Sequence, residues 1–247
     1  MFRKSLVVVL AVLLVGCGSP GFKADKGSVA SINSVALVAF SVPRIVAEEA
    51  GSGTLSGISA MVSTVKSGGM RGNGADVARD AAAGFVEEMG KLGTLRFVTI
   101  EQVVASGEFK SLVTRFDQSR AGQGTQKSAR EGLPVIVLPP SMTQSDFAAA
   151  AAKALGVDGV VMVDINRLNY FLYTGAMGSG QAKAKGSALF KLFDRNGRAV
   201  WEAGAVVYTE ASGAMVAGGI NPAAAPILNK DIGTTIAKDL IKTYRGG

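Results

Sequence analysis

The stretch from residue 182 to residue 207 restricts the fold more than any other part of this chain. Alternate side chains are small or apolar on both sides of a central tetrapeptide: Ala182, Ala184, Ala188, Phe190 and Leu192 before it, and Ala199, Trp201, Ala203, Ala205 and Val207 after it. The tetrapeptide is Asp194-Arg-Asn-Gly197, and Asn-Gly is strongly preferred in tight hairpin turns. A period of two around such a turn predicts an antiparallel β-hairpin with one buried face.

Other segments supply strands and helices in alternation. Apolar runs predict strands over 34–41, 95–100, 134–138 and 157–165. Helical spacing predicts helices over 73–89, 101–105 and 147–155, and a last helix lined by Leu228, Ile232, Ile236 and Leu240. Thr99 and Thr143 each begin a capping box. This order favours an α/β (α+β) fold: helices packed on a mixed β-sheet that ends in an antiparallel hairpin and a C-terminal helix.

The first sixteen residues have the layout of a secretory signal peptide. Arg3 and Lys4 form a positive end, residues 6–15 are apolar without interruption, and Gly16 precedes Cys17, the only cysteine of the chain. The apolar run is too short for a permanent membrane helix. We therefore expect residues 1–16 to be removed.

Leu14-Val15-Gly16-Cys17 resembles the bacterial lipobox. The resemblance implies that Cys17 becomes the mature N-terminus, with a diacylglycerol on its sulfur and an acyl chain on its amine. Two or more acyl chains give a stable anchor, because each buried methylene contributes about 0.8 kcal/mol to the free energy of membrane binding. We expect a lipidated Cys17 and flexible tether over 17–33, and one periplasmic domain over 34–247. Gly18 favours the outer membrane over the inner one; an ordinary signal peptide with an incidental cysteine is the alternative.

Composition removes several classes of function. The chain has no histidine, which excludes Ser-His-Asp catalysis and imidazole metal sites. The formal charge is +7, and loss of Arg3 and Lys4 would leave +5. This favours acidic neighbours such as lipid head groups or an acidic protein face, whereas the scattered cations do not form a nucleic-acid stripe. We expect no cofactor, no metal and no nucleic-acid partner.

Two groups of side chains are candidate contacts with a partner or a membrane. Tyr170, Phe171 and Tyr173 lie in one bulky run, and successive side chains of an extended segment cannot all face inward. They either cover a second layer of the core or are exposed for binding. Lys183, Lys185 and Lys191 share the polar side of the predicted hairpin. They form either a solvated face that discourages edge pairing or a basic strip against acidic lipid or protein.

Glycine-rich and acidic segments give weaker candidates. Gly68-Gly-Met-Arg71-Gly-Asn-Gly74 precedes a helix, where Arg71 and free backbone N–H groups favour anions; a simple helix entry is the alternative. Asp158 and Asp164 lie on one predicted strand and are candidates for acid–base chemistry, although no nucleophile accompanies them.

The helix that leads into Ala-Leu-Gly-Val-Asp-Gly-Val-Val-Met-Val, residues 154–163, resembles an element of envelope lipoproteins with the TolB amino-terminal-domain type of fold. These include the curli-secretion channel lipoprotein and the penicillin-binding-protein activator lipoproteins. The first strand, the hairpin ending at Trp201 and the closing helix follow the order of that family. The resemblance implies a periplasmic binding or assembly domain without catalysis.

The sequence thus predicts a lipid-anchored, non-catalytic binding or assembly module of the bacterial envelope, with an envelope protein as partner. A ring-forming structural lipoprotein, and hence a homo-oligomer, is the alternative. An enzyme that uses carboxylates or a Ser/Lys pair is a third.

Overall fold

The computed structural model describes residues 22–43, 47–50, 74–120, 130–133, 143–174, 180–216, 219–221 and 223–246. The strands are β1 (Lys23–Ala24), β2 (Ser34–Pro43), β3 (Ala47–Ala50), β4 (Arg96–Val98), β5 (Arg130–Leu133), β6 (Gly159–Thr174), β7 (Gly180–Asp194), β8 (Ala199–Tyr208), β9 (Gly213–Val216) and β10 (Gly219–Ile220). The helices are α2 (Lys26–Ala30), α4 (Gly74–Gly90), α5 (Ile100–Ala105), α6 (Gly107–Arg120), α7 (Gln144–Leu155) and α8 (Ala225–Gly246).

The strands form a mixed sheet with the order β1-β8-β7-β6-β2-β4. β2 is parallel to β4 and β6, whereas β6, β7 and β8 are antiparallel neighbours. β3 adds to β6, β5 adds to β2, and β9 adds to β7. The predicted fold class, helices on a mixed sheet with a hairpin and a C-terminal helix, is confirmed.

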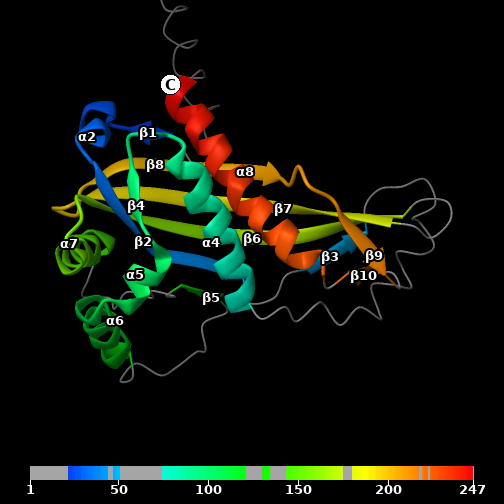
Figure 1. The fold of residues 1–247 in the computed structure, drawn as a ribbon, viewed down its shortest axis with the longest axis horizontal. Helices are drawn as coiled ribbons and strands as arrows, with labels where there is room; N and C mark the ends of the chain where they lie inside the picture. The colour runs from blue at the N-terminus through cyan, green and yellow to red at the C-terminus, as the bar shows by residue number, and fades with distance from the viewer. Residues whose placement is uncertain are drawn as a thin grey trace, which may run out of the picture.

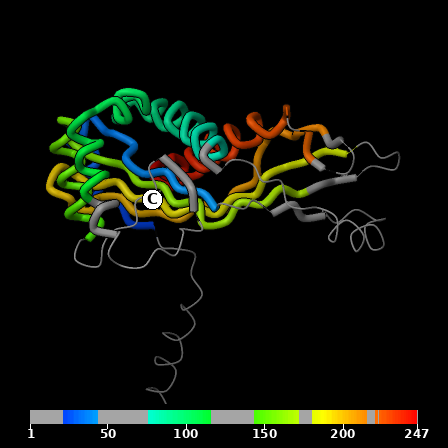
Figure 2. Tube along the Cα trace, turned by 90° about the horizontal axis from the view of Figure 1, so that it is seen from below, coloured from blue at the N-terminus to red at the C-terminus, as the bar shows by residue number. Residues whose placement is uncertain are grey.

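Two helical layers cover the two faces of the sheet to different extents. α4 and α8 lie side by side over the central strands (Figures 1 and 2) and bury an aromatic core that includes Phe40, Phe85, Phe190 and Trp201. α5, α6 and α7 pack on the other face and bury a smaller cluster around Phe109, Phe147 and Phe193. The second layer covers only the end of the sheet where β6 begins, since Val160 and Phe193 are the members that β6 and β7 contribute to its buried cluster.

The local signals read from the sequence act as predicted. The Thr99 and Thr143 side chains accept hydrogen bonds from the third helical residue of α5 and α7, and both capping boxes are complete. Gly156 ends α7 at φ 63° and Gly197 turns the β7–β8 hairpin at φ 79°, in the left-handed region that glycine tolerates best. β2 ends at Pro43.

The predicted flexible tether over residues 17–33 is wrong for its second half. β1 pairs with β8, Asp25 caps α2, and Val29 and Ile32 are buried in the main core. The Gly/Ser/Ala composition of this region concealed two well-spaced apolar residues, whose burial holds the segment on the sheet. Residues 22–33 therefore belong to the described fold, together with the predicted domain from Ser34 onward.

Two further expectations change. Residues 107–132 are polar and show no clear helical period in the sequence, yet they include a full helix, α6, whose residues Phe109 and Leu112 are buried against α7. The strand predicted to stop at Ile165 continues to Thr174, so that β6 and β7 form a long hairpin that extends beyond α4 (Figure 1). The predicted strand 134–138 and residues 51–73 lie outside the described residues.

Candidate functional site

One side of strands β6, β7 and β8 packs under α4 and α8, and the other side is open beyond α7. We call this second side the open face; its residues are Asp164, Arg167, Asn169 and Phe171 of β6, Lys183, Lys185, Ser187, Leu189 and Lys191 of β7, and Glu202, Val206 and Tyr208 of β8. Val206 is 60% exposed and Tyr208 is 51% exposed. Within the described ranges, no helix covers the part of this face between Arg167 and Tyr208.

Tyr170 does not belong to the open face, which corrects its prediction as a partner contact. Its side chain is 2% exposed and lies in the main core, where its hydroxyl donates a hydrogen bond to Oδ1 of Asn229 in α8. The cause is a bulge in β6 between Ile165 and Arg167, which shifts the alternation by one residue. Leu168 and Tyr170 thereby face inward.

The same bulge turns Phe171 outward. Phe171 is half-buried, and its ring centroid lies 6.3 Å from that of Tyr208. Tyr173 belongs to β6, but its side chain lies outside the described residues. One aromatic residue of the three proposed is therefore placed on the open face.

Lys183, Lys185 and Lys191 all lie on the open face and are half-buried. The Lys185 ammonium lies 5.1 Å from the centre of the Tyr208 ring, a cation–π geometry. In the part of the chain that the structure describes, none of the three forms an ion pair with a carboxylate. Arg71 and the glycine-rich segment around it, like Cys17, lie outside the described residues.

A hollow of about 670 Å³ lies in the middle of the open face. It is lined by Asn166, Arg167, Asn169, Phe171, Lys185, Ser187 and Val206. Sequence reasoning missed Arg167 and the asparagines because the strand was expected to end at Ile165. Sequence reasoning also missed Val206 and Tyr208. Because they are apolar or aromatic residues on the polar side of the predicted hairpin, the sequence could have indicated an exposed apolar patch there.

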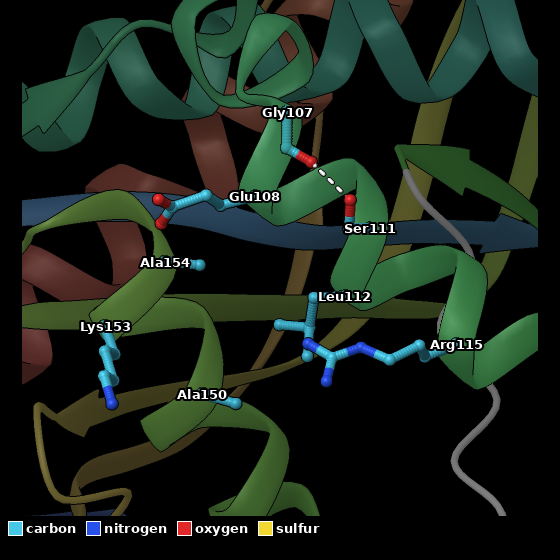
Figure 3. Close-up of a pocket in the computed structure, with 8 residues that line it drawn as sticks. All are labelled: Gly107, Glu108, Ser111, Leu112, Arg115, Ala150, Lys153 and Ala154. Atoms are coloured by element: carbon cyan, nitrogen blue, oxygen red, sulfur yellow. Dashed lines mark hydrogen bonds between the residues drawn. The ribbon is translucent and has the colours of Figure 1, made fainter.

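A second hollow, of about 460 Å³, lies between α6 and α7 (Figure 3). Leu112, Ala150 and Ala154 form its apolar part, and the polar side chains of Glu108, Arg115 and Lys153 lie around it. The Ser111 hydroxyl donates to the carbonyl of Gly107 within α6, a helix-internal contact that does not involve the cavity. This groove was not foreseen, because α6 was not expected as a full helix.

The two carboxylates considered for acid–base chemistry have separate structural roles. Asp158 accepts hydrogen bonds from the backbone N–H and the hydroxyl of Ser34 and pairs with Arg195 at 2.7 Å. These bonds, those from Ser34 first, lower the pKa of the Asp158 carboxyl. Asp164 accepts a hydrogen bond from the Ser41 hydroxyl. Asp164 lies six residues beyond Asp158, which corresponds to about 20 Å along an extended strand. The two do not form a catalytic pair.

The described ranges contain neither a metal-binding cluster nor a membrane-spanning helix. No group of three or more His, Cys, Asp or Glu side chains comes together there in a way that could hold a metal ion. No helix among these residues combines the length and the apolar character needed to cross a membrane.

Comparison with known proteins gives distant structural likenesses. No protein-family model matches the chain, and no curated protein matches its sequence. Lipoprotein GNA1162 from Neisseria meningitidis aligns at 13% identity and a TM-score of 0.28, over 87% of this chain and 99% of that one. A PelC dodecamer from Paraburkholderia phytofirmans aligns at 13% identity and a TM-score of 0.24, over 85% and 86%.

The LpoB C-terminal domain from Escherichia coli aligns at 12% identity and a TM-score of 0.22, over 72% of this chain and 84% of that domain. These values describe a loose resemblance in fold. The chain is similar to these bacterial proteins in fold.

Proposed function

We propose that this protein is a lipid-anchored, non-catalytic binding module of the bacterial cell envelope, and that its open face binds a partner protein. The anchor is the lipid expected on Cys17, which follows from the signal-like segment and the Leu-Val-Gly-Cys sequence. The binding surface follows from the burial of the sheet.

The observation that carries the proposal is the uneven cover of the sheet. Val206 and Tyr208 are exposed at positions where the neighbouring strand residues of the hairpin are polar, and Phe171 packs beside Tyr208. Exposed apolar patches rimmed by polar residues mark interaction sites, and aromatic residues are enriched at protein interfaces. Because a half-buried Lys185 already covers one side of the Tyr208 ring, this part of the face is partly ordered before a partner arrives.

Site-specific photo-cross-linking in intact cells tests the surface. A photoreactive phenylalanine analogue at Val206 should give an adduct with one envelope protein that mass spectrometry identifies. The matched control is Ile227 of α8, which is 59% exposed and apolar but lies outside the open face. The analogue at Ile227 should give no such adduct.

A second substitution makes the test specific. Tyr208→Ala removes a ring from the open face without opening the core, so it should strongly reduce the adduct formed from Val206. Adducts of equal yield from both positions, or an adduct that Tyr208→Ala leaves unchanged, would contradict the proposal. An adduct with a second copy of this chain would indicate that the open face mediates self-association and does not bind a different protein.

A further inference from the structure

Among the described residues that line the hollow on the open face, two are cations and none is a carboxylate. Arg167 of β6 lies opposite Ser187 in the register, and Lys185 of β7 lies two residues away on the same side of the sheet. Diagonal neighbours of this kind have Cβ atoms about 7 Å apart. Both side chains line the hollow, and among the described residues neither forms an ion pair.

The two described carboxylates of the open face, Asp164 and Glu202, are not among the described residues that line the hollow. Asp164 is hydrogen-bonded to Ser41, and Glu202 lies in register with Lys191 on one side and Lys23 on the other. In the backbone register, Glu49 of β3 pairs with Phe171, in the same row as Lys183. Among the described residues that line the hollow, Arg167 and Lys185 therefore repel one another and no carboxylate provides a counter-charge.

The remaining lining residues suit a peptide. The Asn166 amide and the Ser187 hydroxyl can both donate and accept hydrogen bonds, as a peptide backbone requires, whereas an ionised phosphate group only accepts them. Val206 and Phe171 supply apolar contact beside them. A guanidinium presents paired N–H donors that match the two oxygens of a carboxylate.

We propose that the hollow binds the carboxylate of an acidic segment of the partner protein, held between Arg167 and Lys185. This inference rests on the proposed function, because it names the chemistry of the partner that the open face receives. The segment lies across β6, β7 and β8, with its carboxylate in the hollow and its apolar side chains over Val206 and Tyr208.

Fluorescence anisotropy with the full-length protein in mild detergent tests the site. The probe is a fluorescein-labelled octapeptide of alternating glutamate and tyrosine; the control probe replaces each glutamate by glutamine. The double substitution Arg167→Gln/Lys185→Gln should weaken binding of the acidic probe at least about tenfold, since it removes both charge partners. The control double substitution Arg115→Gln/Lys153→Gln removes the same charges from the α6–α7 groove and should change binding less than about twofold.

Lys185→Arg keeps the charge and should retain binding of the acidic probe, and thermal melts followed by circular dichroism establish that each variant is folded. Equal losses for the two double substitutions, equal affinity for both probes, or binding only to phosphatidylglycerol vesicles would overturn the inference. If these occur while the Val206 cross-link persists, the proposed function stands and only the acidic segment is rejected. Loss of the Val206 cross-link as well would reject both the proposed function and the acidic segment.

Discussion

At the scale of single residues, Asp158 joins three parts of the sheet at one point. Its carboxylate accepts from the backbone N–H groups of Asn33 at 3.3 Å and Ser34 at 3.1 Å, from the Ser34 hydroxyl at 2.9 Å, and from Arg195 in the hairpin turn at 2.7 Å. The start of β2, the start of β6 and the turn after β7 are thereby held together. A charged acceptor with several donors is a strong local contact.

Asp158→Asn should lower the free energy of unfolding by about 2 kcal/mol at pH 7, because the charge-assisted hydrogen bonds are lost. The bonds lower the pKa of Asp158 in the folded state below its ordinary value of 3.8, so the contribution is complete above that value. It disappears as the pH falls through 3.8 toward the lower folded-state pKa. Urea unfolding of both proteins from pH 7 to pH 2 should show the difference shrinking below about pH 4; a difference independent of pH would contradict this account.

Tyr170 tests the buried side of the same strand. Tyr170→Phe should lower the free energy of unfolding by about 1–3 kcal/mol, because the buried Asn229 loses the donor to its Oδ1 atom. Tyr208→Phe is the matched control: its ring is half exposed to solvent, and its stability should be unchanged within about 0.5 kcal/mol. Equal effects of the two changes, measured by urea unfolding, would show that Tyr170 is not bonded as described.

At the scale of elements, α4 and α8 approach each other through glycines. A Cβ atom at Gly233 of α8 would lie 1.8 Å from the carbonyl oxygen of Ala81, and one at Gly84 of α4 would lie 2.1 Å from that of Lys230. The two helices therefore pack with backbone against backbone. Both must stay close, because together they cover the aromatic core of the sheet.

Gly233→Ala should separate the two helices and lower the free energy of unfolding by about 3 kcal/mol, as overpacking does. Gly90→Ala at the end of α4 is the control, since a Cβ atom there meets no atom within 4 Å. It should be neutral or stabilise by up to about 1 kcal/mol, because alanine favours a helix. Thermal or urea unfolding measures both; a tolerated Gly233→Ala would disprove the close crossing.

Elements with a strong local signal could be predicted, and those set by tertiary contacts could not. Asn196-Gly197, the two threonine caps and the β2 run act over a few residues, so their outcome follows from the sequence. The β6 bulge depends on how β6 pairs with β7, and it alone decides that Tyr170 is inside and Phe171 outside. The alternation of the sequence predicts that the lysines share the open face. It does not predict the position of Arg167, because Arg167 lies beyond the bulge.

At the scale of the whole molecule, the unequal cover of the two faces separates stability from binding. α4 and α8 hold the core on one side, and the open face carries exposed apolar and basic side chains on the other. Substitutions on the open face should therefore alter partner binding without much change in stability.

Cys17→Ser tests the anchor. The substituted protein should leave the membrane fraction for the soluble fraction, and the mass of the N-terminal peptide should lack the lipid, because serine offers no thiol for diacylglycerol transfer. Cell fractionation and mass spectrometry provide the two readouts. Normal processing and unchanged membrane association of Cys17→Ser would refute the anchor.

The early start of the folded part has a consequence for reach. Only residues 18–22 separate Cys17 from β1, and a stretch of this length extends at most about 20 Å. This linker is shorter than α8, whose 22 residues measure about 33 Å. If a lipid occupies Cys17 as proposed, the β1–β8 edge lies within about 20 Å of the leaflet. The open face would then bind its partner close to the bilayer. A partner anchored in the opposite membrane of the envelope would have to extend across the periplasm to reach it.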